Sequence, residues 1–279
     1  MVSKSVSVAL AVVGALVLLP VLVWTILLLV ARLVFHTPTE LDKHVVFVYT
    51  PRRHQAILRI LRHFHAFCLS HSIPYWVCGG TLLGQQRCQG IIPFDDDADV
   101  AVPLEHIDFI KQNFVSEHPR FTIQNHNVPE FKVWDLSESE PAFVDVFGVV
   151  IDDSIQAYRF TQDARTAFAK QVFYPAEVFP LQTVAFHDIE VLCMSSPQDY
   201  LERTFTPEWN TQLVVYPGHA WQNWVTLSAA LQLGSQQLAL TDNVRDIMTQ
   251  LAQQTVSLPD GDLDSVPNDM KEQVVPSTL

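Results

Sequence analysis

The sequence predicts an α/β (α+β) fold, in which helices flank a mixed β-sheet, preceded by one membrane-spanning helix. Three observations lead to this prediction. An uncharged apolar run occupies residues 6–31. From residue 52 onward, segments whose apolar residues recur at helical spacing alternate with short apolar runs that suit strands. Four aspartates fall within residues 95–99, between two of those apolar runs.

The N-terminal apolar run is long enough to cross a bilayer, which requires about 20 residues in a helix. It is longer than the apolar core of a cleavable signal peptide, and it is apolar all round, unlike an ordinary core helix. We therefore expect a short tail over residues 1–5 and a signal anchor over residues 6–34. The anchor is expected to be the single span, because no later segment has comparable length.

Basic residues around the anchor leave its orientation open. Lys4 precedes it, whereas Arg32, Lys43, Arg52 and Arg53 follow it. The positive-inside rule, taken alone, places the C-terminal bulk of the chain in the cytosol.

Composition narrows the class of protein. A chain of 279 residues allows one domain with a sizeable core plus appendages. Its net charge of −13 argues against nucleic-acid binding, since nucleic-acid-binding proteins present basic patches. The four cysteines have no metal-binding spacing, and buried free thiols are favoured over a bridge between Cys78 and Cys88.

After a stem over residues 35–51, the chain predicts an amphipathic helix over residues 52–70, packed on the sheet. We expect the histidines of this region at the surface rather than as ligands, because no carboxylate or cysteine lies at ligand spacing from them. These histidines are His54, His63, His65 and His71.

Residues 75–102 are the most informative stretch. An apolar run leads into the turn Gly79-Gly80, then a short segment, the aspartates, and a second apolar run. Carboxylates this close repel one another, and removing them from water is costly unless a cation lies among them. A divalent cation bound by oxygen ligands is the usual remedy.

Spacing sharpens this interpretation. Residues i and i+2 of a strand point to the same face, so Asp97 and Asp99 are expected to project together. A glycine turn lets backbone N–H groups approach a ligand, and a helix that begins near Thr81 directs its positive end at phosphate. This layout is typical of a nucleotidyltransferase-type active site. The alternative is an acidic surface turn, because charge runs are usually solvated.

The following region alternates between helix and strand patterns. The predicted helices and strands cover residues 104–115 (helix), 121–123 (strand), 131–134 (strand), 142–150 (strand) and 163–172 (helix). Asp145 is isolated within the apolar strand, and a lone buried carboxylate is disfavoured unless it pairs or binds metal. A strand beside that of Asp97 and Asp99 can bring Asp145 to the same metal ions; an edge strand with Asp145 facing water is the alternative.

Residues 80–99 resemble the signature of the LicD/fukutin family of phosphotransferases. That signature is a Gly-Thr-Leu-Leu-Gly turn, an Arg, and Ile-Pro-Trp-Asp-Asp-Asp-x-Asp; here the Arg is Arg87, and Phe94 stands at the Trp position. The family's Asp-Ile-Phe strand corresponds to Asp145-Val146-Phe147. The resemblance extends over residues 52–209, where it also includes a Phe-Pro-Leu segment, a β-hairpin and a Tyr-Leu helix.

The resemblance implies a nucleotidyltransferase-like fold over residues 52–232. The composition of residues 233–279, Gln-rich and then acidic with Pro259 and Pro267, predicts a C-terminal helix followed by a disordered tail. The resemblance implies a CDP-linked alcohol as donor (choline, ribitol or glycerol) and a glycan or glycoprotein hydroxyl as acceptor. It also implies a single-pass type II protein of the Golgi membrane with a lumenal catalytic domain, with the endoplasmic reticulum as the alternative.

The predicted catalytic site is a metal site. Asp97, Asp99 and Asp145 are expected to hold one or two Mg²⁺ or Mn²⁺ ions, and one of them, or Asp96, to accept the proton of the acceptor hydroxyl. Five groups are expected to contact phosphate: Gly79, Gly80, Thr81, Arg87 and Lys132. For Lys132 the alternative is an ordinary surface position.

Two other functions remain open from the sequence. The same aspartates would serve transfer of a nucleoside monophosphate, which only the product distinguishes. A catalytically silent module that binds glycans or chaperones an active relative would be expected to lack one of the carboxylates, and all three are present.

Overall fold

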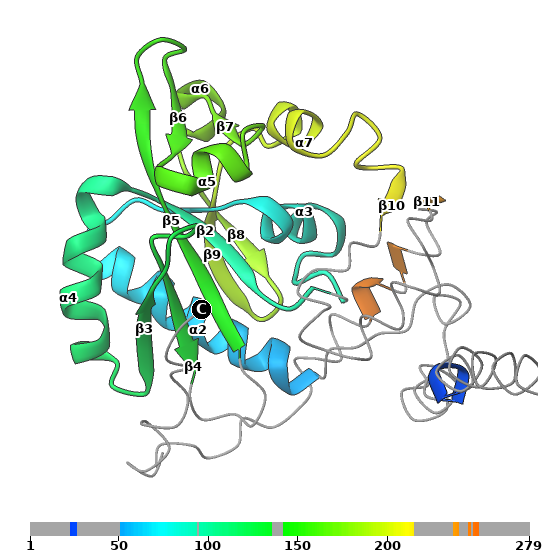
Figure 1. Cartoon of the computed structure of the whole chain (residues 1–279), viewed down its shortest axis with the longest axis horizontal. Coiled ribbons are helices and arrows are strands. Elements are labelled where there is room, and N and C mark those ends of the chain that lie inside the picture. Colours follow the sequence, from blue (N-terminus) through cyan, green and yellow to red (C-terminus); the bar gives the residue numbers. More distant parts are fainter. Residues whose placement is uncertain are drawn as a thin grey trace, which may run out of the picture. The chain divides into compact units, whose positions relative to one another are not determined.

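The computed structural model describes residues 23–26, 51–93, 95–135, 142–214, 237–239, 245–246 and 248–250 (Figure 1). The chain divides into two compact units, residues 1–48 with 215–236, and residues 49–214 with 237–279. The second unit contains the predicted site and is described below. The predicted tail, the stem up to residue 50, and the anchor apart from Val23–Ile26 lie outside the described residues. Among the residues described, no helix has the length and apolar character needed to cross a bilayer.

A mixed β-sheet forms the centre of this unit, as the sequence predicts (Figure 1). Its strand order is β1 (Trp76–Val77), β2 (Ala98–Pro103), β5 (Ala142–Asp152), β4 (Phe131–Asp135) and β3 (Phe121–Asn125). The far half of β5 also pairs with β6 (Ala157–Phe160), which pairs with β7 (Val172–Phe173). Strands β2 and β5 are parallel, and the other neighbouring pairs are antiparallel.

Helices pack against this sheet. The long α2 (Pro51–Ser70) contacts β4 and β5, and its apolar positions, including Ile57, Leu61 and Phe64, are fully buried, so the predicted amphipathic helix is confirmed. Helix α3 (Gly79–Cys88) packs on β2. The 3-10 turn η2 (Leu104–His106) continues into α4 (Ile107–Glu117), which packs on β3.

The chain after β5 departs in part from the predicted pattern. The helix expected over residues 163–172 is shorter: α5 covers Gln162–Ala167, and Val172 already belongs to β7. The reason is tertiary, because Val172 and Phe173 pair with Arg159 and Tyr158 of β6. Such edge pairing overrides local helical spacing.

The last elements include the β-hairpin that the family resemblance implies. They are α6 (Pro175–Val178), β8 (Gln182–Phe186), β9 (Ile189–Cys193), α7 (Gln198–Thr204), β10 (Gln212–Val214) and β11 (Gln237–Ala239). Strands β8 and β9 form the hairpin, and β10 pairs with β11. Within the predicted C-terminal helix and tail, residues 245–246 and 248–250 are helical, whereas β11 was not predicted.

All four cysteines are buried free thiols, in agreement with the favoured prediction. Cys78 immediately precedes α3, and Cys88 is its last residue. The bridge between them that the sequence left open is absent.

Candidate functional site

Asp97, Asp99 and Asp145 converge where the parallel strands β2 and β5 begin. Asp99 lies opposite Asp145 in the β2–β5 ladder, and Asp97 immediately precedes β2. Each of the three offers a carboxylate oxygen, and these oxygens all lie within 4.8 Å of one another. The structure thus brings together the three residues that the sequence singled out, although their catalytic and metal-binding roles stay predictions.

The electrostatics of this trio favour a cation. Burial, and after it repulsion by neighbouring carboxylates, raises the pKa of Asp97 and the pKa of Asp99 well above the usual range for aspartate. For Asp99 the strongest repulsion comes from Asp145. Oxygen donors gathered at this spacing suit Mg²⁺ and Mn²⁺, whose charge would relieve the repulsion. The residues present therefore fit the metal that the sequence predicts.

Close approach of carboxylates explains the glycine turn. A Cβ atom added to Gly79 would lie 2.6 Å from Oδ2 of Asp99, and one added to Gly80 would lie 2.7 Å from Oδ2 of Asp95. Gly79 also has φ of +53°, in the left-handed region that side chains disfavour. Both glycines are thus needed to let the aspartates pack against the start of α3.

Polar groups of the same turn hold Asp99. The backbone N–H of Asp99 donates to Thr81 Oγ1 at 2.7 Å, and the N–H of Gly80 donates to the Asp99 carboxylate. The N–H of Gly79 donates to the hydroxyl of Tyr200 at 3.1 Å. In this structure Gly79, Gly80 and Thr81 therefore organise the carboxylate cluster, and their predicted contact with phosphate stays a prediction.

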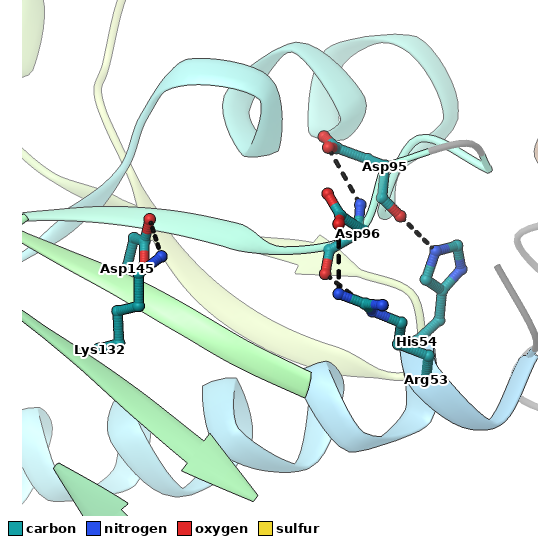
Figure 2. A network of polar contacts seen from close by, with 6 residues as sticks. All are labelled: Arg53, His54, Asp95, Asp96, Lys132 and Asp145. Atoms are coloured by element: carbon teal, nitrogen blue, oxygen red, sulfur yellow. Dashed lines mark hydrogen bonds and ion pairs between the residues drawn. The ribbon is translucent and has the colours of Figure 1, made fainter. Parts of the chain in front are cut away.

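Lys132 lies inside the site rather than at an ordinary surface position. It faces Asp145 across the β4–β5 ladder, with Nζ 2.7 Å from Oδ1 and 3.0 Å from Oδ2 of that residue (Figure 2). Its side chain is buried, and Nζ lies 3.8 Å from the centroid of the Phe143 ring. Lys132 therefore provides a positive charge next to the trio.

Arg87 has a different environment. It lies in the last turn of α3, and its Nε donates to the backbone carbonyl of Trp209 at 3.0 Å. Its Nη2 donates to the same carbonyl. Burial lowers the pKa of Arg87 to about 10, so the guanidinium is still charged at neutral pH. The contact joins α3 to the segment after α7, and the predicted role of Arg87 toward phosphate stays a prediction.

Two site neighbours were missed by the sequence reasoning. Arg53 and His54, in the first turn of α2, contact the acidic loop before β2 (Figure 2). The expectation that the four histidines of this region lie at the surface is wrong for His54 and His65, which are buried. His54 contacts the carbonyl of Asp95, and His65 contacts the hydroxyl of Tyr75. No spacing pattern in the sequence signals either partner.

Tyr200 was also missed as part of the site. Besides accepting from Gly79, its hydroxyl donates to Oε1 of Gln171 at 2.6 Å, and its ring stacks on Phe173. The Tyr-Leu helix of the family pattern was the signal that could have found it.

Comparison with known proteins agrees with the signature. The family model described as LicD/FKTN/FKRP, nucleotidyltransferase domain, matches residues 72–195, a range that contains Asp97, Asp99 and Asp145. The resemblance drawn from the signature is therefore confirmed for this part of the chain. A domain of this family supports a transferase of the phosphotransferase class.

Curated relatives include proteins with and without a stated activity. The chain is 28% identical over 166 residues to the uncharacterized protein RP689 of Rickettsia prowazekii, which covers 59% of each protein. It is 39% identical over 77 residues to the lipopolysaccharide cholinephosphotransferase LicD of Haemophilus influenzae, covering 27% of this chain and 29% of that protein. The matches thus span about three fifths or less of the relatives' lengths.

Two solved structures are similar over most of their length, at low scores. ANT(2")-Ia in complex with adenylyl-2"-tobramycin has a TM-score of 0.32 and 14% identity, covering 73% of this chain and 99% of that chain. An antigenic nucleotidyltransferase-like protein from Paracoccidioides brasiliensis has a TM-score of 0.34 and 11% identity, covering 71% and 93%.

Proposed function

We propose that this protein is a membrane-anchored, metal-dependent phosphotransferase that moves a phospho-alcohol from a CDP-linked donor to a glycan hydroxyl. The observation that carries the proposal is the convergence of Asp97, Asp99 and Asp145 within a LicD/FKTN/FKRP nucleotidyltransferase domain. The cholinephosphotransferase activity of the Haemophilus relative supports phospho-alcohol transfer as the reaction.

In the proposed reaction, the acceptor hydroxyl attacks the phosphorus that carries the alcohol. A new P–O bond forms to the acceptor, the P–O bond to CMP breaks, and the hydroxyl proton passes to a carboxylate of the cluster. Mg²⁺ or Mn²⁺, when bound, supplies positive charge that stabilises the diphosphate and the departing CMP.

The chain's own residues would divide the work as follows. Asp97, Asp99 and Asp145 would hold the metal, since their oxygens already lie together. Lys132 lies against Asp145, and its ammonium would pair with a phosphate of the donor. Asp96 is a poorer candidate for the base, because Arg53 is ion-paired with its carboxylate at 3.2 Å.

The proposed location is a Golgi membrane, with residues 6–34 as anchor and the catalytic unit in the lumen. The proposed location rests on the apolar run and on the same order of segments in eukaryotic members of the family, namely a short tail, one span and a catalytic domain. Release of the full chain from membranes by alkaline carbonate, without detergent, would contradict the anchor.

The test uses the full chain, purified in detergent, with Mn²⁺ or Mg²⁺ and a panel of CDP-alcohols. CMP release is followed for wild type, for Asp97→Asn and for Asp188→Asn, a matched control at an exposed ion pair. We expect metal-dependent CMP release for one donor, unchanged in Asp188→Asn and reduced at least about a hundredfold in Asp97→Asn.

Other outcomes would redirect the proposal. An acceptor that carries a nucleoside monophosphate would identify the other transferase reaction that the sequence left open. If no donor is turned over, and neither metal nor CDP raises the melting temperature of wild type above that of Asp97→Asn, the proposed catalytic function is wrong. A binding or chaperone module would then be favoured.

A further inference from the structure

The acidic loop that precedes β2 is held from the side of α2. Arg53 donates from Nε to the backbone carbonyl of Asp96 at 3.1 Å and from Nη2 to Oδ2 of Asp96 at 3.2 Å. His54 Nε2 lies 2.8 Å from the backbone carbonyl of Asp95. A carbonyl oxygen only accepts, so Nε2 of His54 carries the proton and donates. Two consecutive residues of α2 thus bind three acceptors of the loop (Figure 2).

These contacts are buried. The side chains of Arg53 and Asp96 are 11% and 4% exposed, and His54 is 4% exposed. Burial lowers the pKa of His54 to about 4, so the imidazole is neutral at physiological pH. A buried charged pair with two hydrogen bonds holds its geometry far better than an exposed ion pair does.

The placement of Arg53 runs against local helix preference. Basic side chains are unfavourable in the first turn of a helix, where the helix dipole is positive, and α2 has no acidic residue in that turn. Asp96 offsets this cost by bringing a carboxylate to Arg53. Arg53 is thus unfavourable for its own helix but bound to a distant loop, which indicates that its contribution is to stabilise the loop.

The opposite side of the loop rests on α3. Oδ2 of Asp95 approaches Gly80 so closely that a Cβ there would lie 2.7 Å away, and the N–H of Asp96 is 3.2 Å from Oδ1 of Asp95. The residue that follows, Asp97, is the first member of the trio. Any shift of Asp96 therefore moves Asp97 relative to Asp99 and Asp145, which are fixed in the β2–β5 ladder.

We propose that Arg53 and His54 are positioning residues that fix Asp95 and Asp96, so that Asp97 joins Asp99 and Asp145 in one metal site. Both residues lie outside residues 72–195, the part matched by the family model. The inference rests on the proposed function in one respect, namely that the trio binds a divalent metal. It assigns Asp96 to holding the loop, through Arg53, rather than to ligating the metal.

The test measures the affinity of the full chain for Mn²⁺, from the paramagnetic resonance signal of free Mn²⁺. Loss of an outer partner of a metal ligand typically weakens binding by about 10–100-fold. Arg53 contacts Asp96, the neighbour of the ligand Asp97, so we expect a weakening near the lower end of that range, about tenfold, for Arg53→Met. A smaller weakening is expected for Arg53→Lys, which keeps the charge. The matched control is Arg62→Met, on the same helix. Nη2 of Arg62 lies 2.8 Å from Oδ2 of Asp188, and both side chains are exposed. This control is expected to bind Mn²⁺ as wild type does.

A double-mutant cycle identifies the route of the effect. If Arg53 acts through Asp96, the double variant Arg53→Met/Asp96→Asn binds Mn²⁺ no more weakly than Asp96→Asn alone. For His54, the leucine variant is expected to weaken binding and His54→Gln to restore it, because the Gln amide can donate to the Asp95 carbonyl. A general loss of folding would not be restored in this selective way.

Each failure has its own signature. If Asp97→Asn abolishes Mn²⁺ binding but Arg53→Met binds Mn²⁺ as tightly as wild type does, the inference is wrong and the metal site stands. Additive losses of affinity in the double-mutant cycle would overturn the inference in the same way. If wild type itself binds no Mn²⁺ and matches Asp97→Asn, the proposed function fails and the inference fails with it. Should Arg53→Met not fold, Arg53→Lys and the two His54 variants decide the question by the same measurement.

Discussion

Strand β4 carries a buried charged side chain near each end, and the charges around these two side chains differ in sign. Positive groups surround the one at Asp135, and negative groups surround the one at Lys132. At Asp135, one fully buried carboxylate meets two guanidinium groups, with Arg59 Nε at 3.0 Å and Arg120 Nε at 3.2 Å. At Lys132, the other end, one ammonium lies beside Asp145, close to a cluster with four further aspartates. In that cluster Arg53 forms a second ion pair, with Asp96.

The difference separates a charge cluster that the chain neutralises by itself from the cluster for which we propose a function. Around Asp135 the carboxylate is met by cations of the chain itself, so this cluster requires no ligand. In the acidic cluster burial, and after it repulsion between the carboxylates, raises the pKa of Asp97 and of Asp99. An external cation would offset this repulsion, which is why we propose a metal site in the acidic cluster.

The largest effect on stability is expected at the Asp135 cluster. Asp135→Asn removes the carboxylate but leaves Arg59, whose side chain is only 8% exposed, without that countercharge. Breaking a buried ion pair from one side costs about 3–5 kcal/mol. Urea unfolding of the full chain, followed by circular dichroism, should show this loss in the free energy of unfolding.

The control for this prediction is Asp188→Asn, which breaks an exposed pair with Arg62. Exposed pairs contribute about 1 kcal/mol or less, so the control should remain near wild type. Equal stability of the two variants would show that the Asp135 cluster contributes nothing beyond a surface pair.

The same substitution in the acidic cluster is expected to have the opposite sign. Asp99→Asn should raise the melting temperature of the metal-free chain, measured in EDTA at pH 7, by several degrees. The reason is that the folded-state pKa of Asp99 is raised, so its ionised form destabilises the fold. This gain over wild type should shrink as pH falls through the folded-state pKa, because wild type then takes up the proton that relieves the repulsion.

Metal should reverse the order of these two proteins. A ligand at a hundred times its dissociation constant stabilises the folded state by about 2.7 kcal/mol. Saturating Mn²⁺ should therefore raise the melting temperature of wild type and leave Asp99→Asn unchanged. A lower melting temperature of Asp99→Asn in EDTA would contradict the view that the cluster is strained by its own charge.

Much of the fold and the centre of the site could be predicted, because both follow from local patterns. Apolar spacing located α2 and the strands β3, β4 and β5, and the lone Asp145 in an apolar strand indicated a partner strand for Asp99. The parallel β2–β5 pairing supplies that partner. Here the free-energy cost of burying the Asp145 carboxylate predicted its long-range contact with the strand of Asp99.

What could not be predicted depends on contacts between distant segments. Arg53 and His54 are more than 40 residues from the aspartates they bind, and nothing in their own helix favours them there. Tyr200 lies 121 residues from Gly79, whose N–H it accepts. The helix predicted over residues 163–172 ends at Ala167, and Val172 belongs to β7, whose pairing with β6 lies outside the reach of helical spacing. Sequence periodicity contains no information on such partners.

The smallest of the expected effects concerns the link between α2 and the acidic loop. Burial lowers the pKa of His54 from 6.5 to about 4 in the folded protein. As pH falls below 6.5, the unfolded chain therefore takes up a proton before the folded protein does, and wild type loses stability. His54→Gln retains a donor for the Asp95 carbonyl but has no group that titrates there.

Relative to His54→Gln, wild type should lose about 1 kcal/mol of unfolding free energy between pH 7 and pH 5.5. Urea unfolding of both proteins in EDTA at the two pH values measures this difference. Repulsion among the aspartates changes with pH in both proteins alike, so the comparison isolates His54. Parallel pH profiles would mean that His54 ionises as readily in the folded protein as in the unfolded chain. The loop would then be held by Arg53 without a neutral, buried imidazole beside it.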